Sequence, residues 1–286
     1  MRKQWNRAAA LLLAAALLLT LCACGKKPVQ PEQPEDPVVT PEQPEQPEDP
    51  IVTPEQPETP EIPVPVTVDA LSAQKTVAAE DGATLLEYTL SYPQTAELEQ
   101  VSAYYQALEQ RRQAEMDSYE AQLPQLRQET EAEGMPFLPY SFDADYSILR
   151  NDGVLLSILR TNEDFTGGIH PQYSYSAETF LVAEQQLLTL DAMFSVPEEQ
   201  YLPVILEEIR RAMDENEQQA GAAIYFDDAR DSLADLLDPS HFAVDGTGLV
   251  FFFEEYTLAP YAEGLQQFHL KAAEHLDILN GAWFFA

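Results

Sequence analysis

Short runs of alternating apolar and polar residues are the clearest pattern between residues 67 and 286, and such alternation is typical of half-buried β-strands. Several runs are separated by Asp-Gly or other glycine-containing turns, which join the strands of β-hairpins. The pattern predicts strands over the following segments: 66–79, 84–92, 142–150, 154–161, 172–183, 242–244, 249–255 and 268–270. We expect most of them to pair as antiparallel hairpins.

A helical period of apolar residues replaces this alternation in two long segments. Residues 95–134 are helical in composition, and Pro124 is predicted to break or kink this helix. We expect a helix to about Gln122 and then a shorter, exposed one. Residues 195–198 have the spacing of a capping box and are predicted to begin a second helix, which has one apolar face. Pro203 is the alternative reason for a helix start further downstream.

Two shorter helices complete the pattern. One is predicted over residues 228–237, and the other closes the chain, with Gly281 as its C-terminal cap and the apolar residues 283–285 packing back onto the core. Strands and helices in this order predict an α+β fold, in which antiparallel hairpins pack with several helices. We divide this fold into two intertwined subdomains, residues 67–185 and 186–286.

Residues 1–24 follow neither period. A basic start precedes an uncharged run over residues 8–20, and the sequence Leu-Cys-Ala-Cys-Gly follows at 21–25. This order resembles a bacterial lipoprotein signal, in which the cysteine after a small residue is lipidated; here that residue is Cys24. The resemblance implies a lipid anchor in the cell membrane and a protein that faces the extracytoplasmic side. An ordinary signal peptide or an N-terminal anchor helix is the alternative.

Residues 25–66 form a separate, proline-rich segment. The sequence of residues 31–40 returns with one substitution at 44–53, and neither copy has enough apolar residues to bury a face. Frequent prolines remove amide donors and favour extended polyproline II, so we predict a disordered tether that holds the domain away from its anchor. Recognition by a polyproline-binding partner is the alternative.

The composition of residues 67–286 bears on the partners of the protein. This part has no cysteine, and its 39 acidic and 10 basic residues give a formal net charge of −29. A charge of this sign and size argues against nucleic acid and against a second contact with an anionic membrane, and it favours a basic partner. Solubility of an exported protein is the simpler explanation of the same charge.

Three motifs, taken together, resemble one exported domain family. They are Thr-Gly-Gly-Ile-His-Pro at 166–171, Leu-Thr-Leu-Asp-Ala-Met-Phe at 188–194, and Gly-Leu-Val-Phe-Phe-Phe at 248–253, which leads into the segment 256–264. The family is the domain of unknown function at the outer end of RsiV-type anti-sigma factors, which also accompanies the catalytic domain of PdaC-type peptidoglycan deacetylases. The resemblance runs over residues 86–270.

The resemblance implies an α+β binding domain, because the outer domain of RsiV is a receptor for lysozyme. RsiV-type proteins add a cytoplasmic sigma-binding segment and a transmembrane helix, and PdaC-type proteins add a metal-dependent deacetylase domain. The sequence leads us to expect none of these parts in this chain. The expected protein is therefore a binding module without the output domain of either relative.

The search for catalytic and metal-binding motifs gives no candidate. His269 and His275 are six residues apart, which suits neither a helical pair of ligands nor a short metal finger. Glu254 and Glu255 are adjacent on a predicted strand, so we expect their side chains to point to opposite faces and not to flank one bond. The sequence has no familiar nucleophile motif either. We therefore predict a protein that is not an enzyme and holds no cofactor or metal.

Four residues are the candidates for contact with a partner: His170, Tyr256, Pro260 and Tyr261. His170 follows two glycines that are predicted to adopt positive φ, and a local role in that turn is the alternative for its ring. The other three form a corner that either packs internally or presents an aromatic anchor.

The predicted function is that of a surface-anchored binding protein for a basic cell-wall hydrolase such as lysozyme, acting as receptor, decoy or inhibitor. Two alternatives stay open. One is an enzyme or accessory subunit that acts on cell-wall glycan, and the other is a lipoprotein that contacts peptidoglycan as a scaffold.

Overall fold

The computed structural model describes residues 63–284. The predicted signal peptide with Cys24, and nearly all of the predicted tether, lie outside this range and stay predictions. Among the described residues, no helix has both the length and the apolar character of a membrane span.

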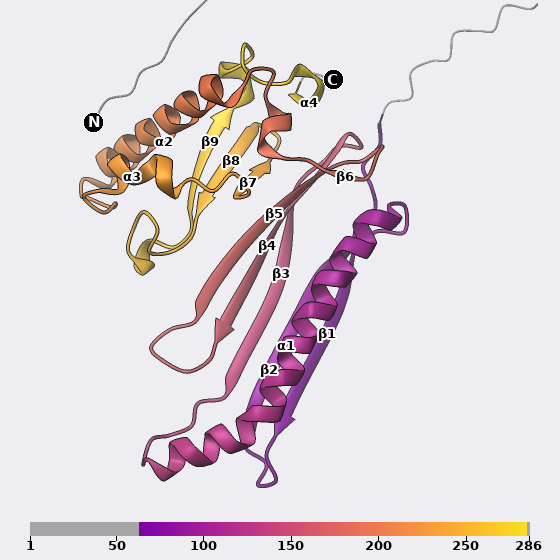
Figure 1. Cartoon of the computed structure of the whole chain (residues 1–286), viewed down its shortest axis with the longest axis vertical. Helices are drawn as coiled ribbons and strands as arrows, with labels where there is room; N and C mark the ends of the chain where they lie inside the picture. The colour runs from indigo at the N-terminus through magenta and orange to yellow at the C-terminus, as the bar shows by residue number, and fades with distance from the viewer. Residues whose placement is uncertain (1–62, 285–286) are drawn as a thin grey trace, which may run out of the picture. The chain divides into compact units, whose positions relative to one another are not determined.

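Six strands form one mixed sheet in the first half of the described chain (Figure 1). Their order across the sheet is the same as their order in the sequence. The strands are β1 (Asp69–Ala78), β2 (Thr84–Gln94), β3 (Tyr140–Asn151), β4 (Leu155–Phe165), β5 (Gln172–Leu181) and β6 (Gln186–Leu187). The two hairpins predicted in this half are confirmed, because β1 pairs antiparallel with β2, and β3 pairs antiparallel with β4.

One pair of strands differs from the predicted antiparallel arrangement. Strands β2 and β3 run parallel, with Thr89 opposite Asp143. The helix α1 (Glu99–Ala132) connects them, and a helical crossover is the usual way for a chain to return as a parallel neighbour. The alternation within each strand carries no information about this pairing.

Helix α1 is one continuous helix of 34 residues, so a break at Pro124, with a first helix that ends near Gln122, is wrong, and the kink is the alternative that remains. Figure 1 shows it changing direction toward its C-terminal end, as expected where a proline removes a backbone hydrogen bond. Buried Leu123 holds the turn before Pro124. After it, the Arg127 guanidinium donates to both carboxylate oxygens of Asp81, at 2.9 and 2.7 Å, and holds the pKa of Asp81 well below its usual range. Contacts on both sides therefore continue the helix through the proline.

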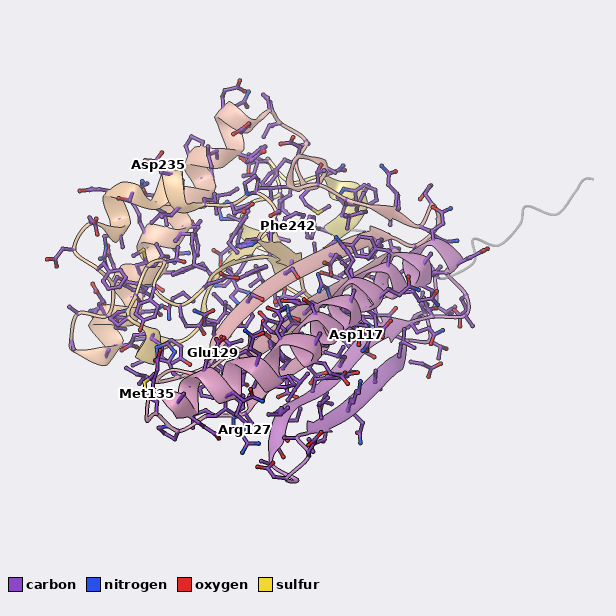
Figure 2. The ribbon with its side chains drawn as sticks, turned by 60° about the horizontal axis from the view of Figure 1, so that its bottom comes forward. Asp117, Arg127, Glu129, Met135, Asp235 and Phe242 are labelled. Carbon is purple, nitrogen blue, oxygen red and sulfur yellow. The ribbon has the colours of Figure 1, made fainter. Side chains whose placement is uncertain are left out.

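The first hydrophobic core lies between α1 and one face of the six-stranded sheet. Alternate residues of β2, such as Leu86 and Leu90, point into this core, and α1 contributes Tyr105. The opposite side of α1 is polar and exposed, and Figure 2 labels Asp117 and Glu129 on it. One layer of helix thus covers this face of the sheet.

An ion pair is buried in this core. Glu178 on β5 is 4% exposed, and it accepts hydrogen bonds from the Arg160 Nη2 at 2.7 Å and Nε at 3.0 Å. The hydroxyls of Tyr104 and Tyr105 donate to the same carboxylate, each at 3.3 Å. Burial, together with this carboxylate, raises the pKa of Tyr105 well above its usual range. The buried charge is thus surrounded by donors, as its desolvation requires.

Three antiparallel strands and two helices form the second half of the described chain. The predicted strands are confirmed as β7 (Phe242–Val244), β8 (Gly248–Phe253) and β9 (Gln266–Lys271). With α2 (Glu198–Ala220) and α3 (Ala229–Leu236) they enclose a second hydrophobic core. Strand β8 begins with a glycine because a Cβ on Gly248 would lie 2.1 Å from the carbonyl oxygen of Leu270 on β9.

Helix α2 begins differently from the prediction. Its N-cap residue is Pro197, and no side chain caps the helix. The Ser195 hydroxyl instead donates a hydrogen bond to the backbone carbonyl oxygen of Ile278 at 3.1 Å. Pro203 lies inside the helix and does not move its start. The turn before Pro203 is held by Tyr201, whose ring stacks on Phe194 with centroids 4.0 Å apart.

The C-terminal segment also differs from the prediction. Gly281 begins the short helix α4 (Gly281–Phe284) and does not cap a longer one; between β9 and α4 lies the 3₁₀ turn η3 (Ala272–Glu274). The expected packing of the apolar end onto the core is confirmed for Trp283, whose Nε1 donates to the carbonyl oxygen of Ala192 at 2.6 Å.

The predicted α+β class is confirmed: a mixed six-stranded sheet and a three-stranded antiparallel sheet combine with four α-helices among the described residues. Leu155 at the start of β4 packs in the second core, and the Val244 N–H on β7 donates to Ser157 Oγ on β4 at 3.0 Å. The two halves therefore share residues of one strand. The boundary between residues 185 and 186 stays a prediction.

We predict that Glu178→Ala lowers the free energy of unfolding by about 3–5 kcal/mol, because it leaves the Arg160 guanidinium buried without a counterion. Urea denaturation followed by circular dichroism measures this change. Asp81→Ala is the control, since it removes an exposed ion pair and is expected to have a far smaller effect. Equal effects of the two substitutions would contradict the structural role of Glu178.

Candidate functional site

Two loops that are far apart in the sequence meet beside the start of β5. The first, residues 166–171, links β4 to β5, and the second, residues 254–265, links β8 to β9. The ring of His170 stacks on the ring of Tyr261, with centroids 3.8 Å apart and planes inclined by 22°. The Tyr261 hydroxyl also donates to the carbonyl oxygen of Pro171 at 3.2 Å. These contacts join the two loops.

Two glycines shape the first loop. Gly167 and Gly168 have φ angles of 90° and 117°, which confirms the predicted positive φ. The next residue, Ile169, is 99% exposed. His170 is partly buried, and its Nδ1 lies 2.8 Å from the carbonyl oxygen of Pro171. The loop therefore displays a large apolar side chain at its tip and turns its histidine toward the second loop.

Tyr256 in the second loop has a strained backbone. Its φ is 65°, in the left-handed region, where a residue other than glycine costs about 1–2 kcal/mol. Its N–H donates to the carbonyl oxygen of Ala259 at 3.0 Å, and buried Leu258 and Ala259 fix this turn to the core. The side chain of Tyr256 is 59% exposed, and its hydroxyl lies 3.4 Å from the His170 Nε2.

The structure brings the four predicted partner-contact residues into one place. Pro260 is exposed and precedes the 3₁₀ turn η2 (Tyr261–Glu263), and the rings of Tyr256 and Tyr261 lie 5.8 Å apart. We refer to the following four residues as the aromatic cluster: His170, Tyr256, Pro260 and Tyr261.

Two carboxylates and two further tyrosines border the aromatic cluster. The N–H of Tyr175 on β5 donates to Glu254 Oε1 at 3.0 Å, and its hydroxyl donates to Glu255 Oε1 at 3.1 Å. The ring of Tyr173 lies 6.4 Å from the rings of both Tyr175 and Tyr261. The alternating tyrosines of β5 are visible in the sequence, but only the fold shows that they face the second loop.

The prediction that Glu254 and Glu255 point to opposite faces is wrong. It assumes a strand through residue 255, whereas β8 ends at Phe253. Both carboxylates contact Tyr175 instead, one through its backbone and one through its hydroxyl. The arrangement offers aromatic and apolar contact area within an acidic border. The absence of enzymatic activity stays a prediction.

The pKa values of the tyrosines at this border are raised. Burial, followed by the charge of Glu255, raises the pKa of Tyr175. Burial also raises the pKa of Tyr261, with smaller contributions from Glu255 and Glu163. The pKa of Tyr173 is raised as well, first by burial and then by the neighbouring Glu163. At neutral pH the tyrosines are uncharged donors beside carboxylates, which makes this surface electrostatically suited to a basic partner.

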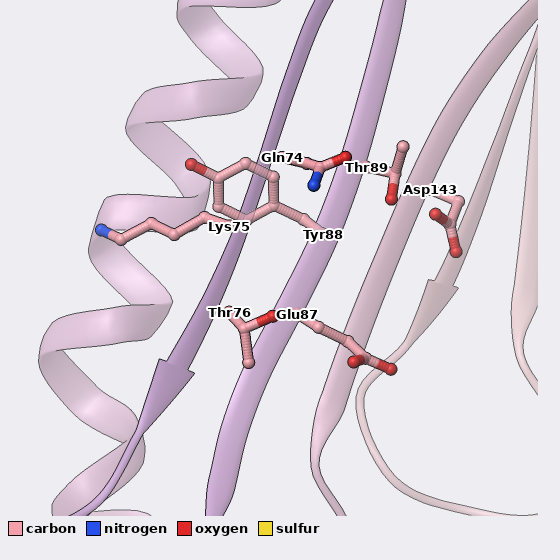
Figure 3. Close-up of a pocket in the computed structure, with 7 residues that line it drawn as sticks. All are labelled: Gln74, Lys75, Thr76, Glu87, Tyr88, Thr89 and Asp143. Atoms are coloured by element: carbon pink, nitrogen blue, oxygen red, sulfur yellow. The ribbon is translucent and has the colours of Figure 1, made fainter.

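A polar hollow on β1, β2 and β3 is a weaker candidate. The hollow has a volume of about 450 Å³. Figure 3 shows the residues that line it. Lys75 and Tyr88 direct their terminal atoms toward α1, where Lys75 pairs with Glu120 and the Tyr88 hydroxyl accepts from Gln113 at 2.7 Å. Because its lysine and tyrosine are already engaged, we do not take this hollow as the functional site.

Potential metal ligands converge at another place. Within residues 63–284, one group of histidine and carboxylate side chains lies close enough to hold an ion: Glu208, Glu274 and His275. None of the three belongs to the aromatic cluster.

Two family models match the chain. The model described as Deacetylase PdaC matches residues 80–173, and the model described as a protein of unknown function, DUF3298, matches residues 192–273. The chain carries a PdaC domain followed by a DUF3298 domain. This confirms the resemblance to the domain shared by RsiV-type and PdaC-type proteins. No curated protein matches the chain.

Two solved structures resemble this PdaC–DUF3298 chain in fold. A DUF3298 family member from Bacteroides fragilis NCTC 9343 has a TM-score of 0.57 and 14% identity, over 77% of this chain and 96% of its own. A DUF3298 family protein from Pseudomonas aeruginosa PAO1 has a TM-score of 0.53 and 15% identity, over 77% and 97%. Nearly all of each solved chain is matched, so the likeness in fold extends over both of them almost entirely.

The aromatic cluster lies where the PdaC domain meets the DUF3298 domain. His170 belongs to the PdaC domain, and Tyr256, Pro260 and Tyr261 belong to the DUF3298 domain. Neither domain alone contains the stacked pair of His170 and Tyr261. The site therefore depends on the contact between the two domains.

We predict that Tyr256→Gly is more stable than Tyr256→Ala by about 1 kcal/mol, because glycine adopts a positive φ without steric cost. Both variants lack the ring, so the difference between them reports the backbone strain less the larger conformational entropy that glycine loses on folding. Urea denaturation of the two variants measures it. A more stable alanine variant would show that residue 256 carries no such strain.

Proposed function

We propose that this protein is a surface-anchored binding protein whose aromatic cluster docks a basic cell-wall hydrolase of the lysozyme type. The observation that carries the proposal is Tyr256, which combines a strained backbone with an exposed ring. Strain of this kind is concentrated at functional sites, because stability alone favours a glycine at such a position.

Exposed apolar contact area supports the proposal. Ile169 is 99% exposed and Tyr256 is 59% exposed, on two loops that the stacked rings of His170 and Tyr261 join. Large side chains on loops that a rigid scaffold positions are typical anchors for a partner's pocket. The outer domain of RsiV-type proteins, a receptor for lysozyme, supports the same class of partner.

Charge supports a basic partner as well. Residues 67–286 have a formal net charge of −29, and the carboxylates of Glu163, Glu254 and Glu255 border the cluster. Complementary charge of this kind accelerates association and makes it sensitive to salt. Receptor, decoy and inhibitor roles all require this same contact.

We predict that residues 59–286, which form one compact unit, bind a basic c-type lysozyme with submicromolar affinity at low salt and more weakly at high salt. Ile169→Ala and Tyr256→Ala are each expected to weaken binding about 30-fold, the effect of losing a hot spot of ~2 kcal/mol. Leu276→Ala is the matched control, since Leu276 is also exposed, at 56%, but lies beyond β9. Isothermal calorimetry measures all of these affinities.

Failure to bind at either salt concentration would contradict the lysozyme proposal. Binding of soluble peptidoglycan fragments, lost in the same two variants, would favour a glycan-contacting lipoprotein. Cleavage of those fragments would favour an enzyme that acts on wall glycan.

We also propose that lipid on Cys24 anchors the protein to the outer face of the cell membrane. Cys24→Ala is then expected to release the protein from the membrane fraction, whereas Cys22→Ala leaves it there, because Leu21 is too large for the position before the cleaved bond. Fractionation with fatty-acid labelling measures both. A Cys24→Ala protein that is still labelled and membrane-bound would contradict this proposal.

A further inference from the structure

Three side chains with metal-binding atoms converge beside α2, at the end of β9. Glu208 lies on α2, Glu274 ends η3, and His275 follows directly. One ligand atom from each residue lies within 4.8 Å of the other two. The fold, rather than a local sequence motif, brings them together.

His275 has an unusual environment. Its side chain is 14% exposed, and its Nε2 atom is buried without a hydrogen-bond partner. A buried polar atom without a partner costs about 1–3 kcal/mol of folding free energy, and a ligand bound to this nitrogen would remove that cost. It faces Glu208 Oε1 at 3.6 Å.

The distance between His275 Nε2 and Glu208 Oε1 suits two ligands of one metal ion. At 3.6 Å it is too long for a hydrogen bond. Two ligands of a tetrahedral ion with bonds of ~2.0–2.1 Å are separated by about 3.4 Å. An ion between the two atoms would therefore satisfy the buried nitrogen with little movement of either side chain.

Neighbouring cations contact both carboxylates. Arg211 donates to Glu208 Oε2, whereas Glu208 Oε1 is the oxygen that lies 3.6 Å from His275 Nε2, so Oε1 is left for an ion. Lys271 donates to Glu274 Oε1 at 3.1 Å, and the Arg211 Nη2 lies 4.0 Å from Glu274 Oε2. Groups that hold metal ligands in this way are typical of the surroundings of a metal site.

We propose that Glu208, Glu274 and His275 bind a zinc ion. One imidazole nitrogen and two carboxylate oxygens suit zinc, whereas calcium and magnesium prefer oxygen ligands alone. Three protein ligands leave the fourth tetrahedral position to water. The ion joins α2 to the segment after β9 and so stabilises the DUF3298 domain. The site shares no residue with the aromatic cluster, so this proposal is independent of the proposed function.

The test is a titration with zinc chloride. The protein is residues 59–286, prepared without a histidine tag and stripped of metal by a chelator. We expect one zinc ion per chain, bound at micromolar concentration or below, and a rise in Tm that magnesium chloride does not reproduce. Cobalt(II) in place of zinc is expected to show the visible absorption of a tetrahedral site. This spectrum reports on the ligands directly, whatever the stability of a variant.

His275→Gln and Glu208→Gln are each expected to weaken zinc binding by more than tenfold, because changes outside the ligand set already cost about 10–100-fold. The matched controls are His269→Gln and Glu215→Gln. His269 is 44% exposed, and Glu215 accepts from Arg211 at 2.9 Å on the same helix without belonging to the ligand group. Both controls are expected to bind zinc as the native chain does.

Two results would overturn the proposal. One is no zinc binding at about 100 μM metal, and the other is an affinity that His275→Gln leaves unchanged. Either result would make the group an ion-pair network, in which Arg211 alone neutralises Glu208.

Discussion

The hydrogen bond from the Tyr175 N–H to Glu254 is the contact on which the candidate site depends. Strand β5 pairs with β6 only at Phe180 and Leu181, so the first part of its outer edge has no neighbouring strand. Such an edge leaves backbone donors in need of acceptors. Glu254, directly after β8, accepts from this edge, and Glu255 accepts from the Tyr175 hydroxyl. The loop after β8 is thereby fastened to β5 of the six-stranded sheet, with the two loops of the aromatic cluster side by side.

The interior of the protein is arranged for stability, whereas the aromatic cluster is not. The buried carboxylate of Glu178 is surrounded by donors from one arginine and two tyrosines, which serves stability. At the cluster, Tyr256 carries backbone strain, and Ile169 exposes its whole side chain. Neither feature stabilises the free protein. Both provide contact area for a partner, on loops that a rigid pair of sheets supports.

Local patterns are sufficient to predict the strands and their hairpin turns, because alternation and glycine turns are properties of short segments. The predicted break at Pro124 and the predicted shift of the helix start by Pro203 are wrong. Both helices continue through the proline, with tertiary contacts of Arg127 after the first proline and of Tyr201 before the second. The parallel pairing of β2 and β3 has no local signal. Each member of the aromatic cluster is recognisable in its own motif, but the packing of two domains decides that they meet. The zinc-ligand group is invisible in the sequence because its members come from α2 and from the segment after β9.

Hydrogen exchange of the Tyr175 amide tests most directly the claim that Glu254 assembles the site. NMR spectroscopy of the native chain and of Glu254→Ala measures it, with Glu263→Ala, an exposed carboxylate of the same loop, as control. We predict slow exchange in the native chain and in the control, and exchange about tenfold faster in Glu254→Ala, as expected for the loss of about 1.4 kcal/mol of local stability. Equal protection of the Tyr175 amide in all three proteins would contradict the claim.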